Sequence, residues 1–239
     1  MFNRVIVAVI GSSKSGKTTA VEILIKGLTE KGYTVASAKR IPEPEFTIDT
    51  EGKDTWRHAK AGASTVLSVA PNELAAIKKV GTTNYSLQQL IEEIPEEIDI
   101  IITEGFKGLV GSNASVSKLV AAKTVSEISE AMKSYKNILA FVTPVPSGKA
   151  ETQIPFIDAL KEPKKLVELV NKKVEEAVER KRKRGEKITI QVGGEFLPLG
   201  DFVQDIIRNA VLGMVASLKG VKIRGEEKVS IAIRRLSRD

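Results

Sequence analysis

One short stretch limits the fold of this chain more than any other. A β-branched run, residues 4–10, is followed at once by GSSKSGKTT, residues 11–19, which matches the Gly-x-x-x-x-Gly-Lys-Ser/Thr pattern of the phosphate-binding loop, or P-loop. The run predicts a strand covered on both faces, and Val21, Leu24 and Leu28 recur at helical spacing beyond the loop. Strand, loop and helix together predict an α/β fold that binds a nucleoside triphosphate.

The residue types of the loop suit phosphate. Glycines let successive backbone N–H groups turn toward phosphate oxygens, and the N-terminus of the following helix adds a positive dipole. Lys17 is expected to reach the β and γ phosphates, and the Thr18 hydroxyl to ligate Mg²⁺. The expected nucleotide-binding residues are Gly11, Ser12, Ser13, Lys14, Ser15, Gly16, Lys17, Thr18 and Thr19.

A magnesium-nucleotide site also needs a carboxylate at the end of a neighbouring strand. Glu104 closes the apolar run IDIIITEG, and open α/β sheets place their ligands at the carboxyl ends of strands. We therefore expect Thr18 and Glu104 to hold Mg²⁺. Asp49 and Asp54, in the Pro-rich and charged excursion after the second strand, are further acidic candidates. The expected catalytic residues are Lys17, Glu104 and Asp54.

The base is not identified by the residues alone. GTPases usually carry an Asn-Lys-x-Asp box after a late core strand, whereas the equivalent place here reads FVTPVPSGKA, residues 141–150. The motifs thus predict a triphosphate site without choosing between guanine and adenine.

The order of segments predicts a doubly wound, mostly parallel sheet over residues 1–170. A helix beginning near Pro163 loses its apolar stripe after residue 178, so residues 171–187, with eight Lys or Arg against four Glu, are expected to form a basic linker. Residues 188–239 read as two hairpins, around Gly193-Gly194 and Gly225, flanking one apolar helix. We expect this small α+β domain to serve oligomerisation or partner contact.

Composition and charge bear on nucleic-acid binding and on the cellular compartment of the protein. The 239 residues include no cysteine, and the net charge of +7 is concentrated in the linker, which favours a solvated helix over a nucleic-acid surface. No apolar run is long enough for a signal peptide or a membrane span. We therefore expect a cytoplasmic protein.

Three motifs taken together, GSSKSGKTT, IDTEGKDTWRHAKAGA and ITEGFKG, resemble the molybdopterin-guanine dinucleotide biosynthesis protein B (MobB) family over roughly the first 170 residues. The C-terminal region resembles an extension found on archaeal members. The resemblance implies a GTP-binding protein with weak intrinsic hydrolysis that acts beside the MobA-type guanylyltransferase joining GMP to molybdopterin. A homodimer is expected as well.

The resemblance also gives candidate residues for substrate binding or switching. Its middle motif would face the nucleotide or the pterin, although a lone histidine is as often a surface residue. Many members have Lys-His after the second strand, whereas Arg40 stands at the histidine position here, so the role of that histidine does not transfer and Arg40 could instead contact a phosphate. The candidates are Arg40, Asp49, Lys53, Arg57 and His58.

Two other functions stay open at this point. A small-molecule kinase or a ligase resembling dethiobiotin synthetase would use the same loop with an added acceptor pocket. A nucleotide-gated scaffold or nucleic-acid binder would use the basic linker and the last hairpin. Stimulation by a small metabolite would favour the first, and salt-sensitive binding of random DNA the second.

Overall fold

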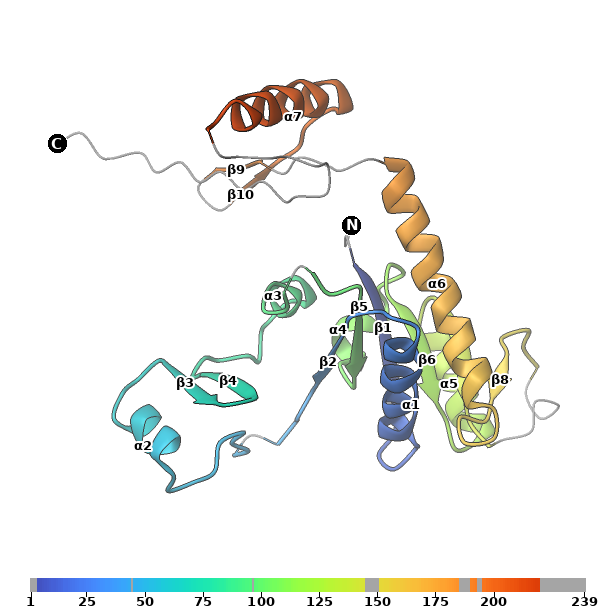
Figure 1. Cartoon of the computed structure of the whole chain (residues 1–239). Helices are drawn as coiled ribbons and strands as arrows, with labels where there is room; N and C mark the ends of the chain where they lie inside the picture. Colours follow the sequence, from blue (N-terminus) through green and yellow to red (C-terminus); the bar gives the residue numbers. More distant parts are fainter. Residues whose placement is uncertain are drawn as a thin grey trace. The chain divides into compact units, whose positions relative to one another are not determined.

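The computed structural model describes residues 4–43, 45–95, 97–144, 151–184, 190–192 and 195–219. The chain divides into two compact units, Met1–Val178 and Glu179–Asp239, and Figure 1 labels most of their elements. The division falls inside the segment 171–187 that the sequence predicts to be a linker. The finer domain limits stay predictions.

The first unit is built on a six-stranded sheet in the order β2-β5-β1-β6-β7-β8, and every neighbouring pair is parallel. Its strands are β1 (Val5–Gly11), β2 (Val35–Lys39), β5 (Ile100–Glu104), β6 (Ser117–Ala121), β7 (Ile138–Val142) and β8 (Phe156–Ile157). Its helices beside the sheet are α1 (Lys17–Glu30), α3 (Leu87–Glu92), α4 (Lys107–Val110), α5 (Val125–Ser134) and the part of α6 (Pro163–Arg184) up to Val178. This is the doubly wound, parallel architecture that the sequence predicts.

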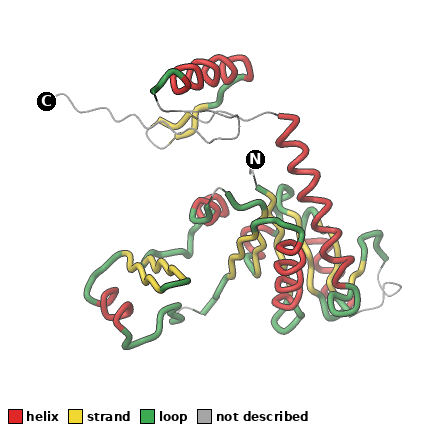
Figure 2. Tube along the Cα trace, in the orientation of Figure 1, coloured by secondary structure: helices red, strands yellow, loops and turns green. Residues whose placement is uncertain are grey.

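Apolar side chains pack on both faces of this sheet, because successive residues of a strand point to opposite sides. Val7 and Val9 of β1 pack on one face with α1 and α6. Ile6 and Ile10 belong to a second cluster with α3, α4 and α5. Figure 2 shows these helices around the strands. Burial on both sides explains why β1 reads as a continuous apolar run.

The segment between β2 and β5 contains a short helix, α2 (Asp54–Lys60), and a hairpin of β3 (Thr65–Ala70) with β4 (Glu73–Lys78). The sequence of β4, ELAAIK, is rich in residues that disfavour strands, so this strand has no clear signal in the sequence. The described residues of β3 and β4 pair only with each other. Leu67, Val69 and Leu74 are exposed on this hairpin.

The second unit contains a hairpin of β9 (Ile190–Val192) with β10 (Glu195–Leu197), followed by α7 (Asp201–Ala216). The predicted turn at residues 193–194 and the second predicted hairpin around Gly225 lie outside the described residues. Helix α7 exposes large apolar side chains, including Phe202, Ile206 and Met214. None of the helices in the described part of the chain is long and apolar enough to cross a membrane.

Candidate nucleotide-binding site

The loop between β1 and α1 requires glycine at two positions. Gly11 has φ 155°, and a Cβ atom there would lie 2.1 Å from the carbonyl oxygen of Ala121 on β6. Gly16, with φ 88°, occupies the N-cap position directly before Lys17 begins α1. Both conformations are rare for residues with a side chain. The two glycines of the P-loop pattern therefore shape a tight turn at the N-terminus of a helix.

Side chains within the loop hold it closed. The Ser15 hydroxyl donates a hydrogen bond to the Ser12 carbonyl at 2.9 Å, and the Lys17 ammonium donates to the same oxygen. Burial lowers the pKa of Lys17, the charge of Glu104 opposes that shift, and the charges of Lys39, Lys123 and Lys107 add to it. Positive charge thus gathers around the loop, as a phosphate site requires.

Glu104 lies beside the loop because of strand pairing. Val9 of β1 and Lys39 of β2 both align with Glu104, the last residue of β5. The Thr18 hydroxyl donates a hydrogen bond to Glu104 Oε1 at 3.0 Å, and Glu104 is only 9% exposed. A hydroxyl and a carboxylate oxygen are ligands that suit Mg²⁺. The structure therefore brings the predicted pair of Thr18 and Glu104 together, with donor atoms that suit Mg²⁺, while binding of the ion stays a prediction.

Three lysines at this edge were missed by the sequence reasoning. Lys39 Nζ lies 3.3 Å from Glu104 Oε1, and Lys123 Nζ donates to the Ser13 carbonyl at 3.1 Å. Lys107 begins α4, close enough to influence the pKa of Lys17. Two of them could have been found from the sequence, because Lys39 ends the strand-like run VASAK and Lys123 follows the strand-like run KLVAA. Lysines at the carboxyl ends of parallel strands meet at the ligand-binding edge.

Arg40 also lies next to Glu104, through its backbone. Its N–H donates to the Glu104 carbonyl at 3.0 Å. A Cβ atom on Gly105, which has φ 87°, would lie 3.3 Å from Arg40 Cβ. The close approach explains glycine after the carboxylate, while contact between the Arg40 side chain and a phosphate stays a prediction.

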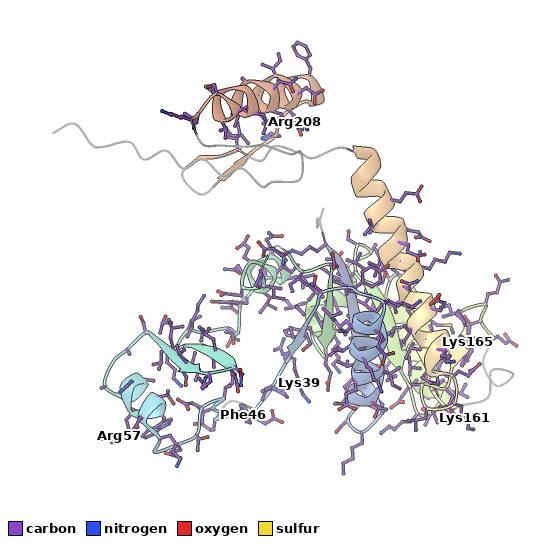
Figure 3. All side chains as sticks on the ribbon, viewed as in Figure 1. Lys39, Phe46, Arg57, Lys161, Lys165 and Arg208 are labelled. Carbon is purple, nitrogen blue, oxygen red and sulfur yellow. The ribbon has the colours of Figure 1, made fainter. Side chains whose placement is uncertain are left out.

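The remaining predicted residues find their partners inside their own segment. Asp49 Oδ1 accepts hydrogen bonds from the Thr50 N–H and the Thr55 hydroxyl at 2.8 and 2.9 Å. Arg57 lies 3.7 Å from Asp54 on the exposed surface of α2. Figure 3 labels Arg57 on α2 and Lys39 on β2. The structure does not bring these groups to the loop, so their roles stay predictions.

Lys53 and His58 also belong to this segment. Lys53 is the N-cap residue of α2 and accepts the Arg57 N–H through its carbonyl, at 2.9 Å. The His58 carbonyl accepts the Ala63 N–H at 3.2 Å. These backbone contacts shape α2, and the roles of Lys53 and His58 at a ligand stay predictions.

Known proteins are similar to this chain over the region that contains the site. A family model described as molybdopterin guanine dinucleotide synthesis protein B, MobB, matches residues 6–144. The molybdopterin-guanine dinucleotide biosynthesis adapter protein of Haemophilus influenzae is 35% identical over 103 residues, 43% of this chain and 57% of that protein. The putative adapter protein of Methanocaldococcus jannaschii is 29% identical over 119 residues, 49% of this chain and 47% of that protein. The chain thus matches about half the length of these relatives.

Solved structures have the same architecture. A crystal structure of molybdopterin-guanine biosynthesis protein B matches with a TM-score of 0.57 and 25% identity, over 72% of this chain and 99% of that one. The MobB homolog from Bacillus stearothermophilus matches with a TM-score of 0.54 and 18% identity, over 73% of this chain and 99% of that one, which shows a common fold. Because the family model spans more than half of the sequence, with both the P-loop and Glu104 inside the match, this chain belongs to the MobB family.

Proposed function

We propose that the protein binds GTP with Mg²⁺ and acts as an adapter in molybdopterin guanine dinucleotide synthesis, with slow intrinsic GTP hydrolysis. The observation that carries the triphosphate site is the hydrogen bond from Thr18 to Glu104, which joins the end of the P-loop to the end of β5. The choice of guanine and of the pathway is supported by the names of the related proteins.

Different residues would contact the phosphates and the magnesium ion. The backbone N–H groups of residues 11–16 would bind phosphate oxygens at the start of α1. The Lys17 ammonium, which donates to the Ser12 carbonyl, would turn to the β and γ phosphates. Thr18 and Glu104 would hold Mg²⁺, which neutralises the charge of the phosphates when bound. Lys123, two residues beyond the end of β6, holds the loop by its bond to the Ser13 carbonyl.

Slow GTP hydrolysis is consistent with the hydrogen bonds and ion pairs that Glu104 and Arg57 make. Glu104 Oε1 already accepts from the Thr18 hydroxyl and lies beside the Lys39 ammonium, so the carboxylate serves cation binding. Arg57 lies beside Asp54 within α2. An arginine that contacts the phosphates contributes about 1000-fold or more in related enzymes, so the slow turnover proposed here requires that neither Arg40 nor Arg57 contacts them.

The proposal predicts dependence on a second protein. The expected partners are a MobA-type guanylyltransferase and its substrate molybdopterin, and the expected assembly is a homodimer. Dinucleotide formation by the guanylyltransferase should rise when the wild-type chain and GTP are added. Lys17→Ala should remove that stimulation. Lys26→Ala, an exposed position on the same helix, should keep it.

The same assay separates the adapter from a small-molecule kinase. A kinase would consume nucleotide rapidly when a small acceptor is added alone, without the guanylyltransferase. Such consumption, together with no stimulation of dinucleotide formation, would contradict the adapter proposal.

A further inference from the structure

Lys39 has an unusual position for an exposed lysine. It is the last residue of β2, and the parallel register aligns it with Glu104 on β5. Its ammonium lies 3.3 Å from Glu104 Oε1, the same oxygen that accepts the Thr18 hydroxyl. The Lys39 side chain is 58% exposed, whereas that of Glu104 is 11% exposed. An exposed cation is thus paired with the nearly buried carboxylate of the proposed metal site.

The ammonium of Lys39 and a hydrated magnesium ion would compete for this carboxylate. Both are cations that bind the same oxygen, and two positive charges a few ångströms apart repel each other. Loading of the metal with a nucleotide therefore weakens the contact between Lys39 and Glu104. Because the lysine stem is long, flexible and exposed here, its ammonium is free to move to another anion.

The nearest new anion would be the terminal phosphate. Lys17 belongs to the loop that receives the β and γ phosphates, and the charge of Lys39 already contributes to lowering the pKa of Lys17. Strand β5 lies between β1 and β2, so Lys39 approaches from the side opposite the loop. Lys39 and Lys17 thus flank the position where the outer end of a triphosphate would lie.

We propose that Lys39 is a sensor of the γ-phosphate: it neutralises Glu104 in the empty site and binds the γ-phosphate once magnesium and a nucleoside triphosphate are present. The assignment rests on the triphosphate site of the proposed function and adds a residue that discriminates triphosphate from diphosphate. A diphosphate offers Lys39 no phosphate at this position, so the contact depends on the third phosphate.

This position also connects the nucleotide to the segment that follows β2. The next residue, Arg40, donates its backbone N–H to the Glu104 carbonyl at 3.0 Å, after which the chain leaves the sheet. If the Lys39 ammonium moves from Glu104 to a phosphate, the change therefore occurs at the start of the segment 40–53. That segment leads to α2, so the presence of the γ-phosphate would alter how α2 is tethered to the sheet.

The test compares two nucleotides in the full-length chain. Affinities for GDP and for a non-hydrolysable GTP analogue with a βγ-imido bridge are measured by calorimetry with Mg²⁺, for the wild type, Lys39→Met, Lys39→Arg and Lys26→Met. Lys39→Met should lose about tenfold or more in affinity for the triphosphate, the size expected for a hydrogen bond between charged groups. Its affinity for GDP should stay within about twofold, and the other two variants should behave as the wild type does.

The other possible results separate the sensor proposal from the proposed nucleotide site. Equal changes in both affinities for Lys39→Met would show that Lys39 acts only on Glu104, and would overturn the sensor while leaving the nucleotide site intact. Failure of the wild type to bind either nucleotide would overturn the proposed function together with the sensor. Thermal unfolding of every variant checks the fold. If Lys39→Met does not fold, Lys39→Gln, which also removes the charge, takes its place and should likewise lose affinity for the triphosphate alone.

Discussion

The Thr18 hydroxyl donates a hydrogen bond to Glu104 Oε1 at 3.0 Å, although 86 residues separate the two in the sequence. The bond forms because β5 pairs with β1 and brings its last residue to the level of the P-loop. A local motif and a distant strand end thus become one site, and the charge of Glu104 is the part of it that a metal ion would use.

Glu104→Gln should weaken the magnesium-dependent part of triphosphate binding by about tenfold or more, because the amide keeps the shape but loses the charge. Affinity measured with a chelator present should change much less. Glu30→Gln, an exposed position at the end of α1, is the matched control. A variant whose binding depends on Mg²⁺ as strongly as that of the wild type would exclude Glu104 from the metal site.

Gly11→Ala should destabilise the fold through a steric clash. Its Cβ would lie 2.1 Å from the Ala121 carbonyl oxygen, whereas a Cβ atom on Gly32, which has φ 91°, would meet none of the described atoms within 4 Å. Gly32→Ala should therefore cost only about 1–2 kcal/mol of unfolding free energy, from its backbone conformation. Gly11→Ala should cost about 1–3 kcal/mol more. Chemical denaturation of both variants measures the difference, and equal losses would argue against the close approach.

Lys118 should make stability depend on pH. It is fully buried on β6, where its ammonium donates to the Asn113 carbonyl, and burial lowers its pKa to about 8. Between about 8 and 10.5 the unfolded chain binds more protons than the folded chain, so the contribution of Lys118 to stability rises with pH across that window.

The matching variant is Lys118→Met, which keeps the length of the side chain without its charge. Its unfolding free energy, relative to that of the wild type, should be most favourable below pH 8 and should decline toward pH 10. Lys133→Met, at an exposed position of α5, should show no such trend. Parallel pH profiles for the wild type and Lys118→Met would contradict the assignment.

Helix α7 is expected to contribute to the proposed homodimer. Ile206 is 52% exposed on it, among other exposed apolar side chains, and burial of such a surface against a second copy would be favourable. Ile206→Asp should therefore shift the assembly from dimer to monomer in light scattering. Asn209→Asp adds the same charge at an exposed polar position and should leave the assembly unchanged. If Ile206→Asp keeps the mass of the wild-type assembly, α7 does not form the dimer interface.

Local signals in the sequence predict much of the fold. Ser86 and Gln89 have the spacing of a capping box, and both hydrogen bonds of that box form. Thr124 and Glu127 have the same spacing: Thr124 accepts the Glu127 N–H, but the Glu127 side chain accepts from the Lys123 N–H instead of closing the box. The strand β8 has only two residues, too few for a pattern of alternation to appear.

The site is less predictable because the register between paired strands depends on segments far apart in the sequence. Glu104 could be expected at a strand end, but its alignment with Lys39 depends on how β2 pairs with β5. The resemblance to the family pointed to Arg40, which stands at the histidine position and whose backbone contacts Glu104. It did not point to Lys39, whose ammonium lies beside the carboxylate. The resemblance to known family motifs drew attention to α2, whose side-chain partners lie within its own segment.

The most direct test of the account is a calorimetric titration of the full-length protein with GTP and with ATP at one concentration of Mg²⁺, repeated with Lys17→Ala. We predict that GTP binds the wild type at least tenfold more tightly than ATP does, and that Lys17→Ala loses the binding of both while keeping the fold. Equal affinities for GTP and ATP in the wild type, or unchanged GTP affinity in Lys17→Ala, would contradict the account.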